Sequence, residues 1–261
     1  MRHFIEALQS LDAIETFVVV CSGMMTLIAA MPWLRTKLLR FNVSRAVNDG
    51  ASDAIKAVAG FTVFVVAFSL VQVQSQYRIT EDLSLKEANA VGTLDRALFH
   101  FGTPAAQAAR EDLQIYVKSV IEDEWPLLAH DQRSPKTDAL YKKFGADIRR
   151  LEPETRRQEA TETQMLRALD EMGDLREARL AATDFGLQPL YWWVMVGLFG
   201  ILLVLAFFTS ATVDKMLANC GLVCALGMMF SLVLIYEDPF AGDINVAPVA
   251  MKRILGVMME R

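Results

Sequence analysis

The four longest hydrophobic stretches of this 261-residue sequence contain no Asp, Glu, Lys, Arg or His at all. They cover residues 16–34, 57–77, 185–213 and 216–236. At about 1.5 Å of rise per residue, each is long enough as a helix to cross a hydrocarbon layer of roughly 30 Å. We therefore expect four membrane helices. Proton pumps need titratable groups at membrane depth, so their absence disfavours a proton-coupled transporter.

The sequence is also poor in residues that carry catalysis or bind transition metals. Its three cysteines, Cys21, Cys220 and Cys224, all lie in the uncharged stretches, where they are best interpreted as small buried apolar residues. The three histidines are scattered, with no second ligand at metal-binding spacing. No nucleophile elbow, phosphate-binding loop or acid–base pair at catalytic spacing is present. The expected protein is therefore not an enzyme and needs no cofactor.

Charge is confined to the regions outside these stretches, and above all to residues 78–184. This block holds 16 Lys/Arg and 21 Asp/Glu, which gives a net charge of −5. An acidic block argues against nucleic acid as a partner, because nucleic acid requires a basic face. The block has no strand-like alternation, and Thr103-Pro104 and Ser134-Pro135 are typical helix starts. Its helical apolar spacing predicts an antiparallel helical bundle.

The predicted fold class is therefore all-α: a four-span integral membrane protein with an extramembrane helical bundle between spans two and three. The apolar spacing of the second span continues into the polar block as far as Phe101, with no proline before Pro104. We therefore expect one helix that leaves the membrane without a hinge. The domains expected along the chain are an N-terminal membrane part (1–77, spans at about 16–34 and 57–77, basic loop 35–56), the bundle (78–184), and a C-terminal membrane part (185–261, spans at about 189–209 and 216–236, tail 237–261).

Basic residues are concentrated in the loop at 35–56, which has five Lys/Arg against two Asp. Short loops rich in Lys and Arg stay in the cytoplasm. We therefore predict a multi-pass protein of the bacterial inner membrane, with the N-terminus, residues 78–184 and the C-terminus outside the cytoplasm. Acidic residues precede the first span, so we interpret it as a retained anchor rather than a cleaved signal peptide.

Two polar or aromatic patterns on the second span suggest a pore. Phe61, Phe64 and Phe68 share one helix face, and a ring of such side chains can gate a channel by excluding water. Gln72 and Gln76 lie four residues apart near the outer end, where they are candidates for a pore mouth. The same patterns are also typical of ordinary helix packing and of an interfacial helix end.

The tail begins with three carboxylates within seven residues, Glu237, Asp238 and Asp243, beside a predicted turn at Gly242. Carboxylates near a glycine turn can hold a hard cation such as Ca²⁺. Ca²⁺ prefers six to eight oxygen ligands, however, so three carboxylates make an incomplete site. The alternative is structural, with Asp243 capping a helix or pairing with a basic residue.

Several short motifs are spread over nearly the whole chain. They are Val47-Asn48-Asp49, the Gly60-started second span, Glu87-Ala88-Asn89-Ala90, Glu124-Trp125-Pro126, Asp238-Pro239-Phe240, Gly242-Asp243 and Val246-Ala247-Pro248. Together they resemble the bestrophin-like domain family, a group of bacterial membrane proteins. That resemblance implies a distant relation to bestrophins, which are pentameric anion channels with their bulk in the cytoplasm. The loop charges of this chain place the corresponding block outside.

Two functions from different classes follow. The first is a homo-oligomeric ion channel, pentameric and anion-conducting by analogy, in which the second span lines the axis and the bundle forms an extracytoplasmic vestibule. A lone four-span chain has too few helices to enclose a pore, so this function requires self-association within the lipid. The second is a non-conducting membrane sensor or scaffold whose bundle binds a ligand or partner.

Overall fold

The computed structural model describes residues 12–39, 43–184 and 186–260. All regular elements within these ranges are helical, which confirms the all-α fold. Four helical stretches are long and apolar enough to cross a membrane, as predicted. They contain α2 (Ala13–Leu34), the first part of α3 (Arg45–Phe101), α8 (Pro189–Phe207) and α9 (Val213–Tyr236). Phe185, Arg40 and residues 1–11, which belong to the predicted spans and loops, lie outside the described residues.

The chain divides into two compact units. The membrane unit contains α2, α3 up to Gln76, α8, α9 and residues 242–244. The bundle unit contains α3 from Tyr77 onward, the helices between α3 and α8, residues 239–241 and the chain from Asn245. The predicted C-terminal membrane part includes the tail, whereas residues 245–260 belong to the bundle unit. The predicted domain limits otherwise stay a prediction.

One helix contributes to both units. α3 runs for 57 residues without interruption, as its apolar spacing predicted. It ends at Phe101 because Gly102 takes a φ of +75°, a left-handed conformation that glycine adopts without a Cβ clash. The apolar spacing after Pro153 predicts a last long bundle helix from about Glu154 to Phe185, stopped by Gly186. In the structure α7 (Arg156–Ala181) ends at Ala181, and residues 182–184 form a 3₁₀ turn.

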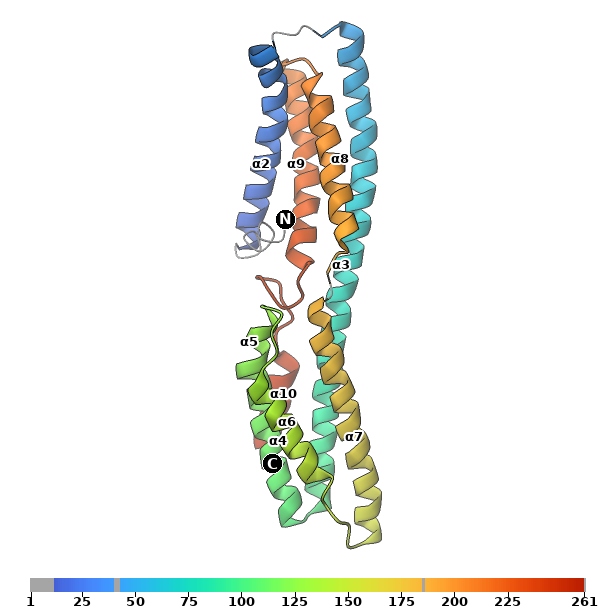
Figure 1. Cartoon of the computed structure of the whole chain (residues 1–261), viewed down its shortest axis with the longest axis vertical. Helices are drawn as coiled ribbons and strands as arrows, with labels where there is room; N and C mark the ends of the chain where they lie inside the picture. The colour runs from blue at the N-terminus through green and yellow to red at the C-terminus, as the bar shows by residue number, and fades with distance from the viewer. Residues whose placement is uncertain (1–11, 40–42, 185, 261) are drawn as a thin grey trace. The chain divides into compact units, whose positions relative to one another are not determined.

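In the membrane unit, α2, α8 and α9 run beside the first part of α3 (Figure 1). α3 buries one face against this group, with residues spaced three or four apart: Ile55, Ala59, Thr62, Val66, Ser69 and Val73. α2 packs closely against α9 at Gly227, where an added Cβ would lie 3.2 Å from the sulfur of Cys21. Small residues permit this close packing in the absence of a hydrophobic drive between membrane helices.

The bundle unit is built from α4 (Pro104–Ser119), α5 (Trp125–Leu128), α6 (Pro135–Ile148), α7 and the second part of α3. α10 (Val249–Met259) completes it and buries Met251 and Met258 in the same core. The predicted starts are confirmed, since the hydroxyls of Thr103 and Ser134 accept the N–H groups of Ala106 and Thr137. Two π-helical turns interrupt the regular pattern, η1 (Arg35–Leu39) in the membrane unit and η2 (Val120–Glu124) in the bundle unit.

Candidate functional site

The predicted phenylalanine stripe lies on the face of α3 opposite its buried face. Phe61, Phe64 and Phe68 keep 57%, 69% and 52% of their surface exposed. Gly60, on the same side, has no atom within 4 Å of the position that a Cβ would take. The other helices of the membrane unit therefore leave this stripe largely uncovered, and it faces either lipid or another chain.

The end of the stripe is less open. The ring of Phe68 stacks on that of Tyr191 in α8, with centroids 6.2 Å apart. The side-chain amide of Gln76 donates to the carbonyl of Gly186 at 3.4 Å, whereas Gln72 is exposed. Gln76 thus joins α3 to the segment before α8, and the pore-mouth role of Gln72 and Gln76 stays a prediction.

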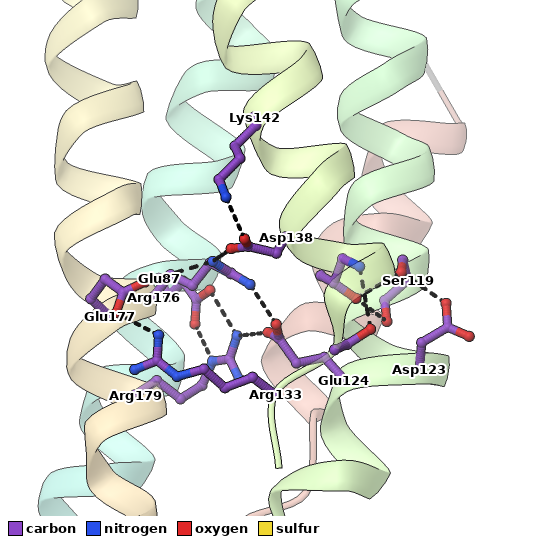
Figure 2. A network of polar contacts seen from close by, with 12 residues as sticks. Glu87, Ser119, Asp123, Glu124, Arg133, Asp138, Lys142, Arg176, Glu177 and Arg179 are labelled. Atoms are coloured by element: carbon purple, nitrogen blue, oxygen red, sulfur yellow. Dashed lines mark hydrogen bonds and ion pairs between the residues drawn. The ribbon is translucent and has the colours of Figure 1, made fainter.

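A buried network of charges occupies the bundle unit, and Figure 2 shows its members converging from α3, η2, α6 and α7. Arg179 donates to Glu87 at 2.5 and 3.2 Å and to Glu124 at 2.7 Å. Arg176 donates to the other oxygen of Glu124 at 2.6 Å and to Asp138 at 3.2 Å. Glu87, Glu124 and Arg179 have no exposed surface at all. Two arginines therefore neutralise two fully buried glutamates.

The surroundings of this network keep its charges fixed. Burial opposes the charge of Arg179, but the carboxylates of Glu87 and Glu124 together outweigh it and raise the pKa of the guanidinium. Burial and the same Glu87 raise the pKa of Tyr116 well above its usual value, so its hydroxyl stays neutral. The guanidinium of Arg179 also lies over the ring of Trp125, 4.8 Å from its centroid. Because Glu87, Glu124 and Arg179 are fully buried and paired with one another, the network suits a structural role.

Trp125 fixes the tail to the bundle. Its indole N–H donates to the carbonyl of Val246 at 2.8 Å, and its ring meets that of Phe240 edge-on at 6.0 Å. Pro126 is exposed in the first turn of α5, whereas Pro239, which precedes Phe240 in the sequence, is buried. Gly242 takes a φ of +76°, which provides the predicted turn. The sequence motifs around Trp125 and Phe240 are thus two halves of one contact.

Asn48 and Asp49 make a similar contact in the membrane unit. The side-chain oxygen of Asn48 accepts the backbone N–H of Ser210 at 2.6 Å, and Asp49 accepts from Lys215 at 3.2 Å. These bonds join the start of α3 to the turn before α9, through Ser210, and to the first turn of α9, through Lys215. Asn89, by contrast, is exposed, and its backbone carbonyl accepts the hydroxyl of Thr93.

The three tail carboxylates do not converge on one point. Glu237 accepts the indole N–H of Trp192 at 2.9 Å, and Asp243 accepts the first N–H of α2, from Ala13, at 2.8 Å. Within the described ranges, no three His, Cys, Asp or Glu side chains lie close enough to hold a metal ion. Asp243 therefore caps a helix, the structural alternative, and calcium binding by Glu237, Asp238 and Asp243 stays a prediction.

A cavity of about 530 Å³ opens in the bundle unit between α3 and the start of α10. Charged residues of both signs line it, together with the buried Ser84. Sequence reasoning missed this cavity and also Arg176 and Arg179. The burial of Arg176 and Arg179 could have been predicted from their spacing. They lie three residues apart and continue the helix face that buries Met165, Leu169 and Met172.

A family model described as the Bestrophin-like domain matches residues 23–251. Among solved structures, a bacterial bestrophin homolog from Klebsiella pneumoniae matches with a TM-score of 0.65 at 14% identity, over 94% of this chain and 98% of that chain. Two mutant structures of a bacterial bestrophin homolog from the same organism give TM-scores of 0.58 and 0.59 at 15% and 16% identity. They cover 94% and 95% of this chain and 99% and 98% of theirs. At such identities the likeness shows the fold. The curated proteins contain no significant match.

Proposed function

This chain belongs to the bestrophin-like domain family, and from that premise we propose that several copies assemble into an ion channel with α3 lining the axis. The observation that carries the proposal is the uncovered stripe of Phe61, Phe64 and Phe68, on the face of α3 that its own helices leave free. Aromatic side chains brought together around an axis form an apolar constriction, which gates by excluding water.

The composition of the stripe supports this role over lipid contact alone. The open space at Gly60 permits close approach of a second α3, and Gln72 supplies a polar group one turn beyond Phe68. By analogy with bestrophins, we propose a pentamer that conducts anions. A channel needs no catalytic group, and we propose no enzymatic activity.

The orientation completes the proposal. The basic loop at 35–56 favours the cytoplasmic side of a bacterial inner membrane. The bundle unit, the N-terminus and the C-terminus then lie outside, and the bundle units of the assembly form an extracytoplasmic vestibule. A cysteine introduced at His130, which is exposed, should react with an impermeant thiol reagent in intact spheroplasts.

The test is a current measurement on the purified chain in planar bilayers. Phe64→Ala shortens the most exposed ring of the stripe, so we expect a few-fold increase in unitary current through the wider constriction. Leu217→Ala is the matched control, since Leu217 is 74% exposed on α9 in the same unit. A strict monomer by native mass spectrometry in mild detergent, or equal currents from both variants, would contradict the channel.

A second function is favoured by the bundle cavity and by the unbroken α3, which contributes to both units. In that case the protein is a sensor or scaffold, in which a ligand or partner of the bundle shifts α3. The predicted cytoplasmic parts are short, so the signal requires a separate cytoplasmic partner. Cross-linking in native membranes that captures no cytoplasmic protein on residues 35–56 would count against this function.

A further inference from the structure

The cavity of the bundle unit lies between two walls, one formed by α3 and the other by the tail. One wall is α3, with Arg78, Glu81 and Ser84, and the other is the tail, with Ala250 and Arg253 at the start of α10. The hydroxyl of Tyr77 donates to the carbonyl of Asn245 at 3.3 Å and joins the two walls. The cavity is therefore a built feature of the packed tail.

Ser84 is a buried polar residue of the cavity lining. Its side chain is 2% exposed and lines the cavity, and its hydroxyl has no hydrogen-bond partner in the described part of the chain. A helical serine usually satisfies itself by bonding to the carbonyl four residues earlier. A buried hydroxyl without a partner costs free energy, which a ligand that accepts or donates a hydrogen bond would recover.

Three exposed charged side chains of the cavity lining have no ion-pair partner among the described residues. Arg78, Glu81 and Arg253 are exposed and form no ion pair with any described residue, whereas Asp82 is held by Lys86 at 2.6 Å. The first turn of α10, an 11-residue helix, also lines the cavity and presents the positive end of the helix dipole to it. Arg253 and the start of α10 can therefore bind an anion on the tail wall, while α3 offers both a cation, Arg78, and a carboxylate, Glu81.

We propose that this cavity binds a small zwitterion of the amino-acid class. Its carboxylate is held by Arg253, the start of α10 and the hydroxyl of Ser84, and its ammonium group by Glu81. Leu85 and Val249 line the same cavity with 48% and 57% of their surfaces exposed, which provides an apolar wall for an aliphatic side chain. This site gives the sensor function its ligand class, but binding does not depend on conduction or on signalling.

The test uses three probes that share one branched aliphatic chain. Leucine carries both charged groups, 4-methylpentanoate carries the carboxylate alone, and 3-methylbutylamine carries the ammonium group alone. Titration calorimetry on the full chain in detergent should show leucine binding at least about tenfold tighter than either fragment, since each lost charge contact costs about 1.4 kcal/mol or more. Equal binding of 4-methylpentanoate and leucine would overturn the zwitterion in favour of a simple anion site, and no leucine binding would overturn the site.

Variants locate the binding. Arg253→Gln should weaken leucine binding about tenfold or more, whereas Lys252→Gln, next to it on the exposed surface and outside the cavity lining, should leave it unchanged. Glu81→Gln should remove the preference for leucine over 4-methylpentanoate. Leucine binding that survives both Arg253→Gln and Glu81→Gln would overturn the proposal. Because binding is measured directly, its failure leaves the tests of the channel and of the sensor's partner unaffected.

Discussion

The two units bury arginine in opposite ways. Arg179 in the bundle unit is 0% exposed and lies between two carboxylates, those of Glu87 and Glu124. Arg35 in the membrane unit is 6% exposed, and its Nε and Nη1 atoms have no acceptor among the residues that the structure describes. The ion pairs described in that unit, Lys56 with Asp53 and Lys215 with Asp49, each keep an exposed member.

The difference follows from what surrounds each side chain. The bundle unit brings charged helices together, so each of the buried cations Arg176 and Arg179 meets anions from two other elements. The uncharged spans of the membrane unit offer none, and Arg35 follows Cys21 and Ile28 at seven-residue spacing on the buried side of α2. A paired buried charge fixes one arrangement of helices, whereas an unpaired one only costs free energy. Substitutions at the two arginines should therefore have opposite effects.

Arg179→Met should produce the largest effect in either unit. It leaves Glu87 without its cation and Glu124 with Arg176 alone, and breaking a buried pair typically costs about 3–5 kcal/mol. Chemical unfolding of the full chain in detergent, followed by circular dichroism, measures the loss. Arg133→Met is the control, because Arg133 is 60% exposed in its pair with Glu177 and should change stability by less than about 1 kcal/mol. Equal losses in the two variants would contradict the role of burial.

The fold of both units was largely predictable because its signals are local. Each signal depends on a few neighbouring residues: the uncharged stretches of membrane length, the helix end at Gly102, the turn at Gly242, and the helix starts at Thr103 and Ser134. The end of α7 was predicted too late, at Gly186, because the 3₁₀ turn at residues 182–184 contains no glycine or proline that would indicate it. The π-helical turns, one of which places Glu124 in the core, carry no sequence signal that we recognise.

The sites were less predictable, because burial and pairing depend on contacts distant in sequence. Glu87 belongs to one of the short motifs named above, but its partner Arg179 lies 92 positions away among many similar charges. The stripe at Phe61 was visible from spacing, yet only the packing of α8 and α9 shows that this face is left uncovered. Ser84 has no distinctive sequence context, and only the packing of the tail shows that it lines a cavity.

Glu237 extends the comparison to a buried carboxyl group of the membrane unit, which has no cationic partner among the described residues. Burial, opposed by the indole N–H of Trp192, raises its pKa from 4.5 to about 7. The folded state therefore holds the proton more tightly than the unfolded state, so unfolding free energy should fall by roughly 2 kcal/mol as the pH rises from 4.5 to 7. Glu237→Gln keeps an oxygen for Trp192 and should remove this component. An unchanged pH profile in thermal unfolding would show that a cation compensates Glu237 after all.

Arg35→Met should have the smallest effect and the opposite sign to Arg179→Met. Methionine keeps the apolar stem and removes a buried charge that has no described partner, so stability should stay equal or rise by about 1 kcal/mol. Lys56→Met, at an exposed pair in the same unit, controls for the loss of one positive charge and should change stability by less than about 1 kcal/mol. If Arg35→Met instead costs as much as Arg179→Met, Arg35 has an anionic partner in the folded protein, and both units then compensate buried charge in the same way.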